Sequence, residues 1–223
     1  MTAWIEFDTA LDVAAAAADT IQENARHSIQ QRGEFKMVLA GGSSPFACYQ
    51  ILSGRDLEWD KWKLFYGDER CLALDDEERN HQIVKASGLS EKIKQHFVIP
   101  SELGSQKGAE LYQSQLSEQL PFDMVLLGMG EDGHTASLFP DHDWKNAAPD
   151  QLTIAVHDAP KVPAERISMT ASALQNCGQM LVLVTGESKR DAVKQWQQGH
   201  CFPVSEVSDI PQAAIYVEAD LMR

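Results

Sequence analysis

The sequence has few cysteines and no long apolar segment, and each of these absences argues against a class of protein. Four cysteines occur among 223 residues, none of them in a Cys-x-x-Cys pair, and no His-Glu-x-x-His or zinc-finger spacing is present. We therefore expect reduced thiols in a cytoplasmic protein, without a structural zinc site or a disulfide framework. No segment is apolar enough to span a bilayer, and we expect no signal peptide because acidic residues interrupt the amino-terminal stretch.

Basic residues are also scarce. Lys and Arg number 19 against 33 Asp and Glu, which gives a formal net charge of -14. Such an acidic chain is repelled by phosphate backbones, so the composition argues against a nucleic-acid partner. A site for a small anion would have to gather its few cations locally, which makes arginines and lysines beside glycine-rich loops informative. The 43% hydrophobic content is enough for a sizeable core.

Strands and helices are predicted to alternate along the chain. Apolar runs predict strands at residues 4–7, 36–40, 63–66, 97–99, 122–127, 180–184 and 213–217, with further extended segments at 151–156 and 166–170. Periodicity and capping residues predict helices at 9–31 and 105–120, and after the loops at 41–45 and 185–190. This alternation predicts a Rossmann-like α/β fold, with a mainly parallel sheet and helices on both faces, in a single domain over residues 1–223.

The strand predicted at residues 122–127 leads into the most informative loop. Three glycines within residues 128–133 would let the backbone turn sharply and approach a ligand closely. Asp132 and His134 follow the carboxyl end of the strand, which is where open α/β sheets bind ligands. Because imidazole exchanges protons near neutral pH, His134 is the best candidate for a base, and Asp132 is close enough in sequence to orient it.

Three more predicted strands end in loops that contain glycine and polar groups. Residues 41–45 place two glycines and two serines before a helix, which suits phosphate binding, although no P-loop lysine follows. Residues 67–70 gather two carboxylates and a guanidinium, and residues 185–190 place cations at the start of a helix. Each loop also has a structural interpretation, as a capped turn, a bracing ion pair or solvated surface charge. A parallel sheet would bring all four loops to one edge, and this convergence favours a site.

Together these motifs resemble a known family. The segments Gly41-Gly42-Ser43-Ser44-Pro45, Gly67-Asp68-Glu69-Arg70 and Gly130-Glu131-Asp132-Gly133-His134-Thr135-Ala136-Ser137-Leu138-Phe139-Pro140 are similar to those of 6-phosphogluconolactonases in the glucosamine-6-phosphate isomerase/lactonase superfamily, as are residues 163–168 and 186–190. The resemblance spans nearly the whole chain, and the string from Gly133 to Pro140 is its most specific part. The visible departure is Ser44, where the family pattern has threonine, and the hydroxyl is retained.

The resemblance implies an enzyme, free of metal and cofactor, that opens 6-phospho-D-glucono-1,5-lactone to 6-phosphogluconate in the oxidative pentose phosphate pathway. It implies His134 as the general base, Asp132 as its neighbour, and Arg70 as a group that binds substrate or stabilises charge. It implies a substrate and phosphate site drawn from Gly41, Gly42, Ser43, Ser44, Asp68, Glu69, Gly133, Arg166 and Lys189. Two points stay open: whether Glu69 is catalytic or pairs with Arg70, and whether the protein is a monomer or a small homo-oligomer.

Two alternatives change the function, and the first of them keeps the fold. An amino-sugar-phosphate isomerase/deaminase would carry a glutamate in the string after Gly-His, whereas residues 135–140 contain no carboxylate. A non-catalytic sugar-phosphate sensor would need a DNA-binding partner domain, and no basic helix-turn-helix candidate occurs in the sequence. The residues suit a δ-lactone, because opening this activated ester requires an oriented water, a base and a cation facing the oxyanion.

Overall fold

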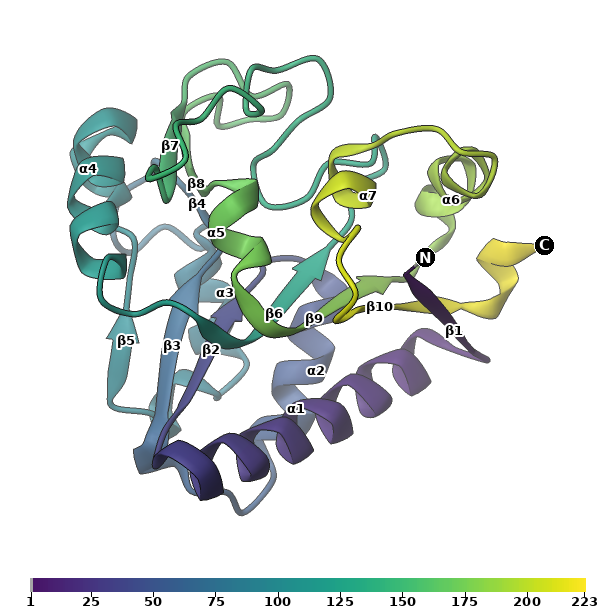
Figure 1. Cartoon of the computed structure of the whole chain (residues 1–223), viewed down its shortest axis with the longest axis horizontal. Helices are drawn as coiled ribbons and strands as arrows, with labels where there is room; N and C mark the ends of the chain where they lie inside the picture. The colour runs from purple at the N-terminus through teal and green to yellow at the C-terminus, as the bar shows by residue number, and fades with distance from the viewer. Residues whose placement is uncertain (1) are drawn as a thin grey trace.

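The computed structural model describes residues 2–223, and a parallel sheet forms its centre (Figure 1). Within this range the large sheet has seven strands in the order β1-β10-β9-β6-β2-β3-β5, and every neighbouring pair is parallel. The strands are β1 (Ala3–Phe7), β2 (Phe35–Leu39), β3 (Trp62–Tyr66), β5 (Gln95–Phe97), β6 (Phe122–Gly128), β9 (Cys177–Val184) and β10 (Ala213–Glu218). The predicted α/β fold with a mainly parallel sheet is confirmed.

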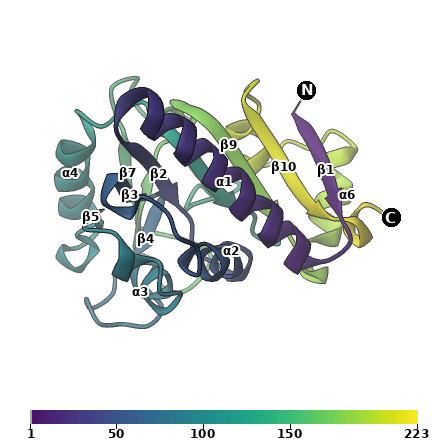
Figure 2. The same cartoon turned by 90° about the horizontal axis from the view of Figure 1, so that it is seen from below.

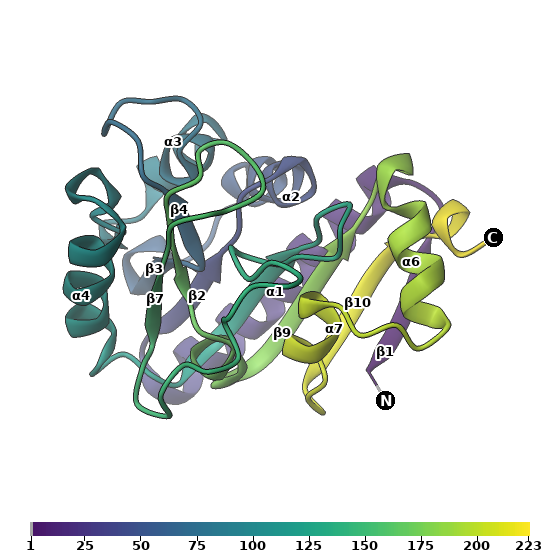
Figure 3. The ribbon, with the colours of Figure 1, turned by 90° about the horizontal axis from the view of Figure 1, so that it is seen from above.

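Helices cover both faces of this sheet, as predicted. The helices are α1 (Ala10–Arg32), α2 (Ser43–Ser53), α3 (Asn80–Ala86), α4 (Ser105–Leu116), α5 (Ala171–Gln175), α6 (Arg190–Gln197) and α7 (Pro203–Val207). Helix α1 crosses one face, with α2 beside it (Figure 2). Helices α6 and α7 lie toward the viewer on the opposite face (Figure 3). Within residues 2–223, no helix combines the length and the apolarity needed to cross a membrane.

A capping residue sets each end of helix α1. The Thr9 hydroxyl accepts a hydrogen bond from the Asp12 N–H at 3.1 Å and so caps the first turn. At the other end Gly33 has φ of 79°, and its N–H donates to the Ile29 carbonyl at 2.8 Å. Glycine adopts this left-handed conformation without steric cost, so the helix ends there.

A second, smaller sheet corrects part of the prediction. It consists of β4 (Asp68–Arg70), β8 (Arg166–Met169) and β7 (Thr153–Val156) in the order β4-β8-β7, with antiparallel pairing. Residues 67–70 were predicted as a loop, but residues 68–70 form a strand that pairs with β8. Three polar residues carry no apolar alternation, so the strand depends on its partner rather than on local sequence. The helices α3, α5 and α7 were also missed, because five to seven residues are too few to show a period.

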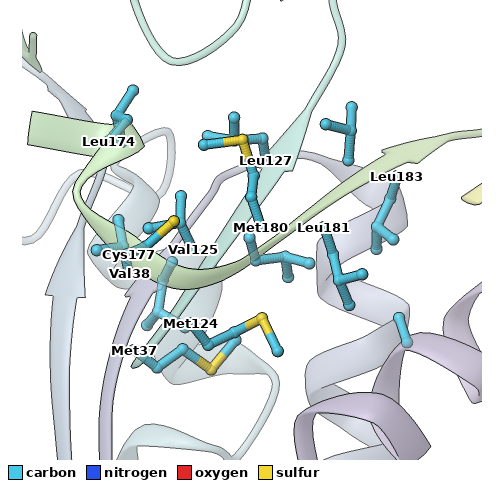
Figure 4. Close-up of a cluster of buried hydrophobic side chains, with 14 of the residues drawn as sticks. Met37, Val38, Met124, Val125, Leu127, Leu174, Cys177, Met180, Leu181 and Leu183 are labelled. Atoms are coloured by element: carbon cyan, nitrogen blue, oxygen red, sulfur yellow. The ribbon is translucent and has the colours of Figure 1, made fainter. Parts of the chain in front are cut away.

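The core lies along the central strands. Apolar side chains from β2, β6 and β9 pack against one another, including the labelled residues Met37, Val38, Met124, Val125, Leu127, Met180, Leu181 and Leu183 (Figure 4). Residues Phe122 to Leu127 are all buried, as the apolar run predicted for a strand covered on both faces. Burial of each such large side chain contributes about 1.5–3 kcal/mol. This dry core fixes the positions at which the strands end.

The topology creates a crevice between β2 and β6. These two strands are neighbours, but the chain continues from β2 to β3 on one side and from β6 to β9 on the other. Loops that leave adjacent parallel strands in opposite directions separate at the carboxyl ends of those strands, where α/β proteins bind ligands. The four glycine-containing loops follow β2, β3, β6 and β9, so the fold brings them to this edge.

Candidate active site

A cavity of about 320 Å³ lies at the carboxyl ends of these four strands. Most of the site residues predicted from the sequence line it: Gly41, Gly42, Ser43, Ser44, Asp68, Arg70, His134, Arg166 and Lys189. The convergence expected from the parallel sheet is therefore present. Asp132, Gly133 and Glu69 are not part of the cavity wall, and each contacts residues that are. The cavity also gathers Thr185, from the predicted loop at 185–190, and Asn80 and Lys161, which were not predicted from the sequence.

His134 is held in one orientation by Asp132. The Nδ1 atom of His134 is hydrogen-bonded to Oδ1 of Asp132, which also accepts the backbone N–H of His134 at 3.3 Å. Burial raises the pKa of Asp132, but the hydrogen bonds and charge of His134 outweigh it and lower this pKa to about 2. The ionised carboxylate requires a proton on Nδ1, which leaves Nε2 of this cavity-lining ring as the basic nitrogen. The ring packs against Phe139, with 4.6 Å between centroids.

Gly130 makes this arrangement possible. A Cβ at position 130 would lie 2.0 Å from Nδ1 of His134 and 2.5 Å from Oδ1 of Asp132, so any other residue would displace the pair. Gly133 is constrained in a different way: its φ is 77°, and a Cβ there would lie 2.2 Å from the Phe202 ring. The glycines of this loop are therefore needed for close packing behind the histidine.

The residues that follow His134 connect its loop to strand β4 by hydrogen bonds. The Thr135 hydroxyl donates to the Gly128 carbonyl at 2.9 Å, which closes the loop on itself. The Ser137 hydroxyl donates to Oδ2 of Asp68 at 2.7 Å, and Oδ1 of Asp68 accepts from Nδ2 of Asn80 at 2.9 Å. The buried Asp68 carboxylate is thus fixed from two sides. We call Asp68, Arg70, Asp132 and His134 the reaction end of the cavity.

Glu69 lies beneath the site and not in it. Its carboxylate accepts backbone N–H groups from Arg70, Asn80 and His81 at 2.9, 2.7 and 2.9 Å. Its ionic partner is the buried Arg79, whose Nε lies 3.7 Å from Oε2. Burial raises the pKa of Glu69 against these hydrogen bonds. This side chain holds the start of α3 against β4, and its contact with Arg70 is through the backbone.

Two arginines reach the cavity from the small sheet. Arg70 donates through Nη1 to the Glu78 carbonyl. Arg166 donates through Nε and Nη2 to the carbonyls of Pro163, Lys161 and Val162 at 3.1, 3.2 and 3.3 Å. Its guanidinium lies over the Phe139 ring at 5.5 Å, and burial lowers its pKa. Arg166 therefore clamps the loop before β8, and its Nη1 takes no part in these three bonds.

A helix start and two lysines add positive charge to the cavity wall. Helix α2 starts at Ser43, after Gly42 with φ of 102°, and within residues 2–223 no side chain caps its first N–H groups. The Ser44 and Thr185 hydroxyls lie 2.5 Å apart at this helix start. Lys161 and Lys189 also line the cavity. Burial lowers the pKa of Lys189, and the charge of Lys161 lowers it further. We call Glu131, Lys161 and Lys189 the cation rim.

Comparison with known proteins places the chain in a family. The sequence profile described as glucosamine-6-phosphate isomerases/6-phosphogluconolactonase matches residues 8–220. The chain belongs to this family. It is 34% identical over 201 residues to a probable 6-phosphogluconolactonase of Schizosaccharomyces pombe, covering 80% of this chain and 77% of that one. It is 30% identical over 207 residues to a 6-phosphogluconolactonase of Neisseria meningitidis, covering 89% and 90%.

A solved structure agrees with these sequence matches. The crystal structure of a 6-phosphogluconolactonase from Shewanella baltica superposes with a TM-score of 0.86 at 26% identity, covering 98% of each chain. The family resemblance predicted from the motifs is confirmed, and so is the prediction of an enzyme, since these relatives bear the name of a lactone-hydrolysing enzyme.

Proposed function

We propose that this chain hydrolyses 6-phospho-D-glucono-1,5-lactone to 6-phosphogluconate, the lactone-opening step of the oxidative pentose phosphate pathway. The observation that carries the proposal is the Asp132–His134 pair, which leaves Nε2 as the basic nitrogen of a cavity wall that also holds a helix start and four cations. The relatives named above support the same reaction. We also propose that the protein acts in the cytoplasm, as a monomer or small homo-oligomer, on a small molecule and not on nucleic acid.

The proposed reaction begins with water attacking the lactone carbonyl carbon. Nε2 of His134 takes a proton from the water as the new carbon–oxygen bond forms, and the ionised Asp132 stabilises the resulting imidazolium. The carbonyl oxygen becomes an oxyanion, which the Arg70 guanidinium faces from the cavity wall. The intermediate then collapses with cleavage of the bond between the carbonyl carbon and the ring oxygen. The imidazolium returns its proton to that oxygen, which leaves as the C5 hydroxyl.

The phosphoryl group is proposed to bind at the α2 start and the nearby cations of the cavity wall. The first N–H groups of α2, at Ser43 and Ser44, and the positive end of the helix dipole favour an anion there. Lys189 and Arg166 add charge, and Lys189 is half-buried, so its attraction is screened less than that of a surface lysine. Binding energy from the phosphoryl group would position the lactone carbon against His134.

No metal ion is required by this proposal. A δ-lactone is an activated ester, so a base and an oxyanion-stabilising cation suffice for its opening. Across residues 2–223 no three or more His, Cys, Asp or Glu side chains are grouped so that they could hold a metal ion. The mechanism therefore assigns every proton transfer to His134 and water.

The test is a hydrolysis assay on freshly generated 6-phosphogluconolactone, with unphosphorylated gluconolactone and glucosamine 6-phosphate as parallel substrates. We expect rapid opening of the phosphorylated lactone that persists in the presence of a chelator. Ammonia release from glucosamine 6-phosphate without lactone opening would instead favour the deaminase. An absence of turnover on all three would favour a sensor, in conflict with the proposal.

A further inference from the structure

An ion pair spans the cation rim and joins two loops. Nζ of Lys161 lies 3.0 Å from Oε1 of Glu131, and both side chains are exposed enough to move. Glu131 follows β6, in the same loop as the histidine, whereas Lys161 lies in the segment between β7 and β8. Lys161 lines the cavity. Neither residue has a role in the mechanism proposed above.

The backbone that carries Lys161 is fixed while its side chain is free to change partners. The buried Arg166 donates to the Lys161 and Val162 carbonyls at 3.2 and 3.3 Å, which anchors this segment above the cavity. The long lysine side chain can therefore turn between Glu131 and the cavity interior without rearrangement of the loop. An exposed ion pair of this kind contributes little to stability, so its exchange costs little.

The cavity wall as a whole favours an anion, because it holds four cationic side chains and one carboxylate, that of Asp68. Lys161 and Lys189 are close enough that the charge of Lys161 helps to lower the pKa of Lys189, after the effect of burial. Glu131 and Asp132 act in the opposite direction on Lys189, and the hydrogen bond and charge of Lys161 lower the pKa of Glu131. A phosphoryl dianion between the two ammonium groups would offer Lys161 more negative charge than one carboxylate does.

We propose that Lys161 is a further residue with which the enzyme selects phosphorylated over unphosphorylated lactone, and that Glu131 competes with the phosphoryl group for it. The inference rests on the proposed function and deepens it. In the free enzyme Lys161 binds Glu131, and in the complex it binds the phosphoryl oxygens. Removal of the lysine and removal of the carboxylate therefore have effects of opposite sign on the affinity for phosphate-bearing ligands.

The experiment compares Lys161→Met and Glu131→Gln with a matched pair outside the cavity. Lys145 and Glu206 form an exposed ion pair at 2.6 Å, and Lys145→Met and Glu206→Gln serve as controls. We expect Lys161→Met to raise KM for the phosphorylated lactone about tenfold, because a charge-assisted hydrogen bond is lost. We expect kcat to stay within about twofold, since the interaction is made equally in the ground and transition states. Turnover of unphosphorylated gluconolactone should not change.

Glu131→Gln should act in the opposite direction, lowering KM for the phosphorylated lactone about two- to fivefold, the size of effect expected for an exposed charge pair. The control variants should leave all constants at wild-type values. The proposal is overturned if Lys161→Met affects both lactones alike, or if Glu131→Gln weakens binding of the phosphorylated lactone. It is also overturned if the Lys145 variant reproduces the effect, because general surface charge would then be the cause.

A binding measurement separates this inference from the proposed reaction. Inorganic phosphate titrated into the wild-type protein by calorimetry should bind more weakly to Lys161→Met and more tightly to Glu131→Gln. If the protein opens the lactone but the phosphate affinities of the variants do not follow this order, the proposed reaction is supported and the role of the ion pair is overturned. The ordering without lactone opening would support the ion pair as an anion selector and contradict the proposed reaction.

Discussion

The reaction end and the cation rim face the same cavity, but they are held in place differently. At the reaction end, Ser137 and Asn80 donate hydrogen bonds to Asp68, and His134 donates to Asp132, so each side chain is fixed by a partly or fully buried partner. At the rim, Lys161 is bound to an exposed carboxylate and can exchange it. Proton transfer depends on orientation within a few tenths of an ångström, whereas attraction to a dianion depends mainly on charge. We therefore expect substitutions at the reaction end to lower kcat and substitutions at the rim to raise KM.

The largest effect is expected at His134. His134→Ala should lower kcat about 100- to 10,000-fold, the usual contribution of a general base, with KM nearly unchanged because the rim is intact. Steady-state kinetics on the phosphorylated lactone measure both constants, and circular dichroism checks the fold. Near-wild-type turnover would show that another group activates the water.

Replacement of Glu69 tests whether this carboxylate, which lies beneath the reaction end, stabilises the fold or takes part in the reaction. Glu69→Ala should lower the free energy of unfolding by about 3–5 kcal/mol, because it leaves three backbone N–H groups without their acceptor and removes one of the two carboxylates beside the buried Arg79. Urea denaturation measures this loss. A stable Glu69→Ala protein with strongly reduced kcat would instead assign Glu69 a catalytic role.

Asp132→Asn should lower kcat about 10- to 1,000-fold, because an amide can stabilise the wrong tautomer of His134 and does not stabilise the imidazolium.

The pKa of Asp132 is lowered to about 2, so its stabilising contribution is complete above the ordinary aspartate pKa of about 3.9 and is lost as pH falls toward 2. The stability difference between wild type and Asp132→Asn should therefore shrink in that window. Denaturation from pH 6 to pH 2 measures it, and a difference that grows on acidification would contradict the assignment.

A smaller effect is expected at Lys189. Lys189→Ala should raise KM for the phosphorylated lactone about tenfold with little change in kcat, since a half-buried cation is removed from the anion site. Turnover measured at saturating substrate distinguishes binding from chemistry. A selective loss of kcat would place Lys189 at the reacting carbon and would remove the distinction between the two regions.

The smallest effect is expected at Ser44. Its hydroxyl lies 2.5 Å from that of Thr185, so Ser44→Ala removes one neutral hydrogen-bonding group from the helix start. We expect KM to rise about two- to fivefold, because the backbone N–H groups and the dipole remain. Ser44→Thr, which restores the residue expected from the family pattern, should keep KM at the wild-type value. A larger loss in Ser44→Ala than in Lys189→Ala would reverse the expected order.

The strands of the large sheet and the loops after them could be predicted from the sequence, whereas the short strand β4 beside the site could not. The strand before Gly128 was visible because five of the six consecutive buried residues that precede Gly128 are apolar. The short strand β4 was not, since the residues Asp68 to Arg70 acquire their conformation from pairing with β8. Antiparallel pairing with a segment about a hundred residues away leaves no local signal in three polar residues.

The same distinction applies to the site residues. His134 and Asp132 are close in sequence, so their pairing could be anticipated from the loop. Asn80 and Lys161 reach the cavity from segments that the sequence does not mark as glycine-rich loops, and they were missed. The available signal for Lys161 was its position five residues before the predicted Arg166. Whether the Lys161 side chain reaches the cavity depends on how its backbone is held, and this is set by the hydrogen bond from Arg166 to the Lys161 carbonyl.

The most direct test of the account is the ratio of kcat/KM for 6-phosphogluconolactone to kcat/KM for gluconolactone, measured in wild type, His134→Ala and Lys189→Ala. The base acts on both substrates alike, so His134→Ala should keep this ratio within about threefold of wild type while both activities fall. Lys189→Ala should lower the ratio about tenfold, because the cation acts on the phosphoryl group alone. A ratio that changes in His134→Ala and stays constant in Lys189→Ala would contradict the division of the cavity into a reaction end and a cation rim.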